Sequence, residues 1–341
     1  MSEAPHRPRT NLPQRMNGAD DAKRGFYGPK VVALGGGHGL FASLSALRLM
    51  THNVTAVVTV ADDGGSSGRL RKEFGVLPPG DLRMALSALC DDGEWGQTWR
   101  DVLQHRFTSN GPMSGHALGN LLILALWEQM GDSVLALDWV GQLLGIKGRV
   151  LPMSPEPLEI EAIVDFGGPR APIRGQVAVA STPGTVEHIG IVPENPPAQP
   201  EAVEAILDAD WVIVGPGSWY TSVIPHFLIP KLREALCTTK ARKALALNLN
   251  ADKETKGMGA AAHIRSLKAH CPDLRFDIIV ADPTSIDDID GAERAATECG
   301  AQLLLRQVRM GDGSARHDPL RLAAAYRDAF TGIFGDVAGA E

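Results

Sequence analysis

Two glycine-rich segments of the chain have the composition of anion-binding loops. GGGHG comprises Gly35, Gly36, Gly37, His38 and Gly39, and DDGGS comprises Asp62, Asp63, Gly64, Gly65 and Ser66. Because glycine has no Cβ, its amides can approach a phosphate closely, and amides at a helix N-terminus attract anions. The frame GHGLFA also satisfies G-x-G-x-x-A, a dinucleotide-binding pattern. A tight strand-to-helix turn without a ligand is the alternative for the first segment.

Asp62 and Asp63 are adjacent carboxylates in the second segment. Such a pair could hold Mg²⁺ or act as acid and base. It could equally accept hydrogen bonds from the amides of its own glycine turn. The sequence ADDGGSSGR is predicted to lie at a ligand, and KEFGVLPP (72–79) is predicted to connect it to GDLR.

His116 and Asn120 lie four positions apart in SGHALGN. With Ser114 as the N-cap, a helix would carry both side chains on one face, toward one ligand. The alternative is a capped core helix whose His116 and Asn120 satisfy nearby carbonyls.

Three later segments add further polar groups. They comprise Gly215, Gly217, Ser218, Tyr220 and Thr221 in GPGSWYTS, Asn248 and Asn250 in NLN, and Arg316 in ARHDP. A structural loop rarely needs as many donors as GPGSWYTS has. Turn capping is the alternative for the two asparagines, and a salt-bridged corner is the alternative for Arg316. Arg69, Arg83 and Arg316 are predicted to add charge-assisted hydrogen bonds to an anionic ligand.

The elements that must position these groups follow a βαβ plan. Apolar runs at 30–34, 54–60, 211–215, 243–250 and 276–280 each lead into a glycine-rich or polar turn, and helical patterns follow several of them. Continuous apolar strands are typical of a parallel sheet covered on both faces, and ligands of such sheets bind at the carboxyl ends of the strands. The sequence therefore predicts a three-layer, Rossmann-like α/β fold with one composite site.

Two regions depart from this plan. Residues 81–145 are largely helical in pattern, and 149–193 alternate between polar and apolar residues, which predicts short antiparallel strands added to the main sheet. We expect a single domain over 29–335 after a disordered tail at 1–28.

Composition excludes several classes of protein. A net charge of −7 argues against an electrostatic nucleic-acid binder. The four cysteines are far apart and form no C-x-x-C pair, which is typical of reduced thiols in a cytosol. The N-terminal segment has no apolar signal region, and the longest apolar run is too short for a membrane span. A cytoplasmic protein is expected.

The order of seven segments resembles a known family. GGGHGL, VTVADDGGSSGRLR, LPPGDLR, GHALGNLL, GRVLPM, GPGSWYTSVIP and RHDP are similar to the YvcK group, often called gluconeogenesis factors, in the superfamily named for the phospholactate transferase CofD. The resemblance implies a cytoplasmic protein that binds a UDP-sugar such as UDP-N-acetylglucosamine. It also implies roles in cell shape, peptidoglycan precursor supply and gluconeogenic growth.

Carried onto this chain, the resemblance places the diphosphate at 35–39. The other matching positions are Asp62, Asp63, Gly64, Gly65, Ser66, Asp81, Arg83, His116, Asn120, Gly215, Gly217, Ser218, Tyr220, Thr221 and Arg316. Two positions depart from the family pattern. His38 replaces a usual threonine, and Met258 stands where an aromatic residue would stack on uracil.

The function inferred from this resemblance is that of a regulator, with no catalytic residue assigned and no certain cofactor. Regulatory protein partners and a homo-oligomer are compatible with it. The alternative is a phospholactate-type transferase that uses Mg²⁺ held by acidic residues. A nicotinamide dehydrogenase built on GHGLFA fits less well. It would need an acidic residue after the second strand to bind a ribose, but ADDGGSSGR at that position has the composition of a loop that wraps an anion.

Overall fold

The computed structural model describes residues 28–250 and 253–332. Its main sheet has seven strands in the order β10-β9-β8-β7-β1-β2-β3, and every neighbouring pair is parallel. The strands are β1 (Val31–Gly35), β2 (Val54–Val58), β3 (Arg149–Pro152), β7 (Trp211–Val214), β8 (Arg242–Ala246), β9 (Ile278–Ala281) and β10 (Gln302–Leu305). The predicted α/β fold with a parallel sheet is confirmed.

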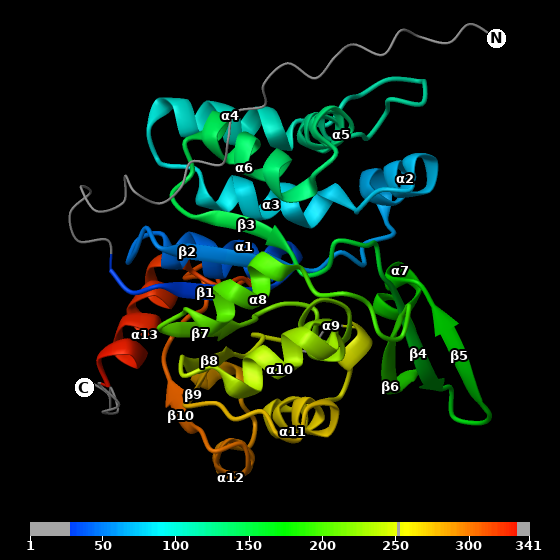
Figure 1. Ribbon diagram of the computed structural model, residues 1–341. Helices are drawn as coiled ribbons and strands as arrows, with labels where there is room; N and C mark the ends of the chain where they lie inside the picture. The colour runs from blue at the N-terminus through cyan, green and yellow to red at the C-terminus, as the bar shows by residue number, and fades with distance from the viewer. Residues whose placement is uncertain (1–27, 251–252, 333–341) are drawn as a thin grey trace, which may run out of the picture.

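The central strands are apolar throughout because helices cover both faces of the sheet. All residues of β1, β7 and β9 are buried. Helices α1 (Gly37–Leu47) and α13 (Pro319–Thr331) cover one face, and α8 (Pro200–Leu207), α10 (Pro230–Thr238) and α11 (Ala260–His270) cover the other (Figure 1). Helix α12 (Ile289–Glu298) joins β9 to β10.

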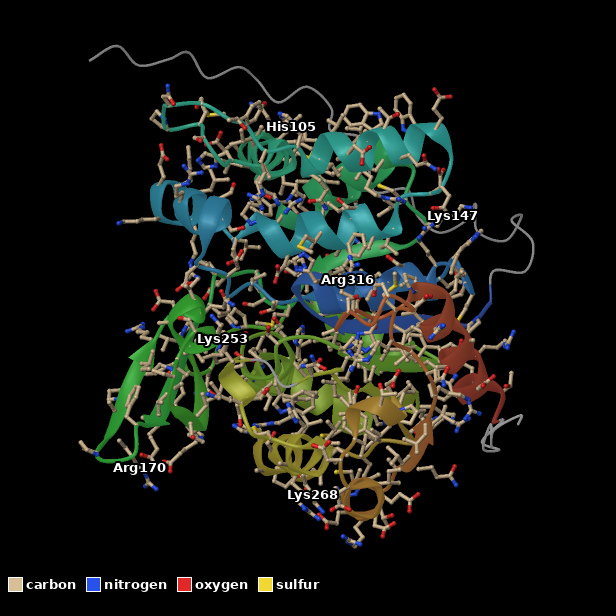
Figure 2. All side chains as sticks on the ribbon, turned by 180° about the vertical axis from the view of Figure 1, so that it is seen from behind. His105, Lys147, Arg170, Lys253, Lys268 and Arg316 are labelled. Atoms are coloured by element: carbon tan, nitrogen blue, oxygen red, sulfur yellow. The ribbon has the colours of Figure 1, made fainter. Side chains whose placement is uncertain are left out.

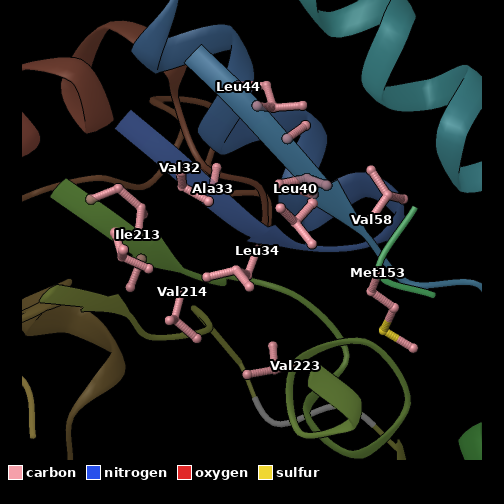
Figure 3. Close-up of a cluster of buried hydrophobic side chains, with 14 of the residues drawn as sticks. Val32, Ala33, Leu34, Leu40, Leu44, Val58, Met153, Ile213, Val214 and Val223 are labelled. Carbon is pink, nitrogen blue, oxygen red and sulfur yellow. The ribbon is translucent and has the colours of Figure 1, made fainter. Parts of the chain in front are cut away.

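The core centres on α1 where it packs over the middle strands. Leu40 and Leu44 of α1 meet Leu34 of β1, with Val58 of β2 nearby (Figure 3). Leu34 is 1 % exposed and Leu44 is 0 % exposed. This packing fixes the start of α1 against the carboxyl ends of β1 and β2.

The predicted helical region at 81–145 lies between β2 and β3. It corresponds to α3 (Pro79–Leu89), α4 (Glu94–Gln104), α5 (Leu118–Met130) and α6 (Ser133–Leu144), and α2 (Gly65–Phe74) precedes it. Helix α2 begins within DDGGS, so the predicted connector at 72–79 is wrong at both ends: it starts inside α2 and finishes on the first residue of α3.

The antiparallel strands form a sheet of their own. The order is β5-β4-β6, with β4 (Glu159–Asp165), β5 (Arg170–Arg174) and β6 (Thr185–Val192). The prediction that these strands extend the main sheet is therefore wrong. This small sheet projects to one side of the molecule, with the short helix α7 (Gln176–Ala180) at its upper end (Figure 1).

The predicted tail at 1–28 lies outside the described residues except for Gly28, as do 333–335 of the predicted domain. Along the described part of the chain, none of the helices combines the length and the apolar character that a membrane crossing requires.

Candidate functional site

A cavity of about 690 Å³ lies at the carboxyl ends of β1, β2, β7 and β8. The strand order reverses at β1, which pairs with β2 on one side and β7 on the other. Ligands of open parallel sheets bind at this switch point. The cavity wall takes residues from the loops after these strands, from α3, from α7 and from the segment before α13.

The first glycine segment forms the junction between β1 and α1. Gly35 ends the strand, and Gly36, Gly37, His38 and Gly39 line the cavity. A Cβ on Gly36 would lie 2.5 Å from Thr59 Cγ2 and 2.6 Å from Asp81 Oδ2. Gly36 is the N-cap of α1 and contributes no side-chain cap. The Gly37 amide hydrogen-bonds to Asp81, and the next amides of this first turn have no acceptor within the helix, as an anion site requires.

The loop after β7 packs directly on this junction. Asn248 Nδ2 donates to Gly217 O and Gly217 N donates to Asn248 Oδ1, both at 2.8 Å. This reciprocal pair ties the loop to the end of β8. Gly217, Ser218, Thr221 and Asn248 line the cavity.

Gly215 and Tyr220 do not line the cavity. Gly215 O accepts from Ser43 Oγ at 2.8 Å, beneath the wall. Tyr220 N donates to Glu254 Oε1 at 2.9 Å and its hydroxyl donates to Met258 Sδ at 3.4 Å. These contacts give both residues a structural role in the loop.

Two buried threonine hydroxyls border the cavity. Thr59 is 2 % exposed and Thr221 is 1 % exposed. Neither Oγ1 has a hydrogen-bond partner among the described residues. Because a buried hydroxyl without a partner is costly, these two groups are suited to a polar ligand. Thr59 was not predicted: it is the sixth residue of the apolar run VTAVVTV, where a threonine is ordinary.

Asp62 and Asp81 present their carboxyl groups to the same cavity. Burial and the nearby Asp62 raise the pKa of Asp81 to about 7, although the Gly37 amide and Arg83 oppose this shift. Burial also raises the pKa of Asp62. Asp62 Oδ1 accepts a hydrogen bond from Gly64 N at 2.9 Å. This is the alternative in which the carboxylate accepts from an amide of its own glycine turn.

Asp63 is separated from Asp62 by the turn. Its Oδ1 accepts from Val177 N at 2.9 Å, in α7. The two adjacent carboxylates therefore do not converge, which does not favour the Mg²⁺ alternative for this pair. Asp62 instead lies close to Asp81, and both residues line the cavity.

Four predicted residues form a hydrogen-bonded cluster that does not line the cavity, and a fifth, Arg69, bonds beside it. Ser66 Oγ lies 3.0 Å from His116 Nδ1 and accepts from Asn120 Nδ2 at 3.0 Å. Arg83 Nε donates to Asn120 Oδ1 at 2.9 Å, and Arg69 Nη2 donates to the Ser114 carbonyl at 2.8 Å. The cluster joins α2, α3 and α5.

The predicted helical face of His116 and Asn120 is wrong. Helix α5 begins at Leu118 with Ala117 as its N-cap, so His116 precedes it and Ser114 is not the cap. Both side chains nevertheless meet at Ser66. Burial and the Arg69 cation lower the pKa of His116, which favours a neutral ring in this cluster.

Arg316 lines the cavity from the segment before α13 (Figure 2). Its side chain is 71 % exposed, and its guanidinium donates to Asp312 Oδ2 at 3.1 Å. The neighbouring His317 also lines the cavity, and burial lowers its pKa to about 4. A neutral His317 ring can donate to the Leu247 carbonyl, 3.3 Å away.

Other cavity residues were not predicted, although their types are visible in the sequence. The polar ones include Gln176, Ser222 and His317 besides Thr59, and the others include Phe41, Ala42, Pro216, Leu249, Met310, Ala315 and Pro319. Gln176 lies in a segment predicted as a strand, and only the fold brings it to the cavity.

The chain matches the family described as "2-phospho-L-lactate transferase CofD" over residues 31–303. A "Putative gluconeogenesis factor" of Mycobacterium leprae is 51% identical over 308 residues, covering 87% of this chain and 85% of that protein. The "Gluconeogenesis factor" of Bacillus subtilis is 35% identical over 261 residues, covering 76% and 80%.

A solved structure is similar over most of the chain. It is the crystal structure of a UPF0052 family member from Bacillus halodurans, with a TM-score of 0.79, 31% identity and coverage of 88% of this chain and 99% of that one. Sequence and structure agree with the resemblance carried by the seven segments. The protein belongs to the CofD family and, within it, to the gluconeogenesis factor (YvcK) group.

Proposed function

We propose that this protein is a cytoplasmic regulator that binds a UDP-sugar, with UDP-N-acetylglucosamine as the preferred candidate. Through that ligand it would influence cell shape, cell-wall precursor supply and growth on gluconeogenic carbon. The observation that carries the proposal is the cavity at the strand switch point, whose volume of about 690 Å³ is in the range of small-molecule sites.

The cavity wall offers two kinds of polar group. The first turn of α1 at His38 and Gly39 supplies backbone amides, and Arg316 supplies a cation, which together suit a diphosphate. Asp62 and Asp81 supply carboxyl groups, which suit hydroxyl donors. A ligand that carries both a diphosphate and a sugar matches both.

A second cavity of about 340 Å³ adjoins the first, sharing Asn248, Leu249 and Asn250. Met258 and His263 are in its wall. We propose this side for the uracil base, with the flexible thioether of Met258 in place of an aromatic ring.

Calorimetry with UDP-N-acetylglucosamine tests the proposal. Arg316→Ala is expected to weaken binding about tenfold, since hydrogen bonds to charged groups contribute about 1.5–3 kcal/mol. Arg170→Ala is the matched control, because Arg170 is 68% exposed, salt-bridged to Glu187 and at the tip of the small sheet (Figure 2).

Two outcomes contradict this. If folded wild-type protein gives no binding at millimolar ligand, the UDP-sugar proposal fails. If Arg316→Ala binds as tightly as Arg170→Ala, Arg316 does not contact the ligand.

Binding is also expected to depend on pH. Asp81, with a pKa of about 7, gains negative charge as the pH rises from 6 to 8, and this charge repels a diphosphate. Affinity for the UDP-sugar should fall roughly threefold over this interval in a buffer with a metal chelator. Asp81→Asn should bind equally at both pH values, whereas the exposed variant Asp273→Asn should keep the wild-type dependence. A wild-type affinity that rises with pH would contradict the assignment.

The second candidate is a transferase of the phospholactate type, and the facing carboxyl groups favour it. Asp62 and Asp81 line one cavity, and two carboxylates with substrate phosphates fit Mg²⁺. Bound there, Mg²⁺ would neutralise diphosphate charge. Absence of transfer to a deazaflavin alcohol, with Mg²⁺ and a phospholactate–nucleotide donor, would remove this candidate.

A further inference from the structure

The turn that contains Asp62 is fastened to the small sheet by its neighbour. Asp63 Oδ1 accepts from Val177 N at 2.9 Å, across 114 positions of the chain. A Cβ on Gly175 would lie 2.6 Å from Asp63 Oδ2, and a Cβ on Gly64 would lie 2.9 Å from Val177 Cγ2. The two segments therefore fit closely on both sides of the hydrogen bond.

Asp63 acts as a helix cap supplied by a distant segment. The N-cap position of α7 is Gly175, with φ 104°, and it has no side chain with which to cap the helix. The first amides of a helix need an acceptor, and a carboxylate is among the best. Asp63 provides this acceptor to Val177 and so fixes the first turn of α7.

The first residue of α7 is Gln176, which lines the main cavity together with Asp62 and Asp81. Carboxyl groups accept hydrogen bonds from hydroxyls but repel phosphates, while a glutamine amide can both donate and accept. Asp81 lies beside the glycine turn, whereas the turn that contains Asp62 is bonded to α7. The side of the cavity formed by Gln176 and Asp62 is therefore suited to the uncharged, hydroxyl-rich end of a ligand. The glycine amides and Arg316 are suited to its charged end.

We propose that Gln176 determines specificity for the hydroxyl-rich end of the ligand, and that Asp63 is a positioning residue that holds Gln176 at the cavity. The proposal rests on the proposed nucleotide-sugar site. It gives the small sheet a part in ligand selection, because Gln176 is the residue through which α7 reaches the cavity wall.

Hydrogen exchange tests the positioning without any ligand. The Val177 amide should exchange several-fold faster in Asp63→Ala than in the wild type, because its acceptor is removed. Asp63→Asn should restore slow exchange, because an amide oxygen still accepts. Asp165→Ala is the matched control, since Asp165 Oδ1 accepts from Gly167 N at 2.8 Å at the far end of the same sheet. Equal exchange of Val177 in all four proteins would overturn the positioning role.

Calorimetry with UDP-N-acetylglucosamine and with UDP tests the specificity. Gln176→Ala should bind the UDP-sugar about fivefold more weakly and UDP unchanged, as expected for one lost hydrogen bond. Asp63→Ala should show the same selective loss and Asp63→Asn should not. The double variant should be no weaker than Gln176→Ala, because the two residues act through one contact.

The outcomes separate the two proposals. If the wild type binds neither UDP compound, the proposed function fails, while the exchange experiment still reports on the contact between Asp63 and Val177. If the wild type binds the UDP-sugar but Gln176→Ala loses equal affinity for both compounds, or for neither, the specificity role is wrong. If Asp63→Asn loses affinity for the UDP-sugar only when Mg²⁺ is present, Asp63 is a metal ligand and not a positioning residue.

Discussion

Gly39→Val is expected to abolish UDP-sugar binding and to destabilise the protein by about 3 kcal/mol. Gly39 lies in the first turn of α1, where a Cβ would be 2.2 Å from Pro216 O and 2.5 Å from Gly217 Cα. Both neighbours are backbone atoms, so no side chain can rotate to relieve the contact. The loop after β7 would have to leave the start of α1.

This displacement would separate the loop after β7 from the first turn of α1, whose amides are proposed to hold the diphosphate. The free energy of unfolding from urea denaturation and calorimetry with the UDP-sugar measure the two effects. Gly168→Val is the control, because nothing lies within 4 Å of a Cβ there and the position is in an exposed hairpin. If Gly39→Val binds with wild-type affinity, the close packing of these two loops is not needed for the site.

The parallel sheet could be predicted because its central strands are short, continuous apolar runs. The runs at 30–34, 54–60 and 211–215 correspond to β1, β2 and β7, and glycine or polar turns mark their carboxyl ends. The edge strands β3 and β10 were missed. Arg149 and Pro152 in β3 and Gln302 in β10 leave these strands without a continuous apolar run, and pairing along one edge places them in the sheet.

Helices α2 and α7 could not be predicted because distant contacts stabilise them. Helix α2 begins with GSSG, which has low intrinsic helix propensity, and Ser66 and Ser67 are buried by their hydrogen bonds to other segments. Helix α7 follows the positive φ of Gly175 and takes its cap from Asp63. In both cases tertiary contacts override local preference.

In the candidate site, too, local sequence predicts some residues and distant contacts decide the others. The first glycine segment and Asp62, Thr221 and Asn248 could be placed at strand ends, since all strands of a parallel sheet end at one edge, whereas the predicted Gly64 and Gly65 do not line the cavity. Position along the chain could not separate cavity residues from those behind the wall. His116 and Asn120 lie in a polar, glycine-containing segment like those at the cavity, but their side chains hydrogen-bond to Ser66 instead.

Thr221→Val is expected to weaken UDP-sugar binding at least tenfold while leaving the free energy of unfolding unchanged or slightly raised. Valine has nearly the same shape as threonine, and Thr221 Oγ1 has no hydrogen-bond partner among the described residues. Removing the hydroxyl therefore costs the unliganded protein no protein hydrogen bond. A hydrogen bond from this hydroxyl to a phosphate would contribute about 1.5–3 kcal/mol to binding.

The opposite directions of the two effects distinguish a ligand contact from a packing role. Ser87→Ala is the control, because Ser87 Oγ is likewise buried without a partner in the described chain but does not line the cavity. It should change stability as little as Thr221→Val and leave affinity intact. Urea denaturation and calorimetry on both variants give the comparison. If Thr221→Val loses stability but keeps its affinity, the hydroxyl serves the fold, and the ligand must lie elsewhere in the cavity.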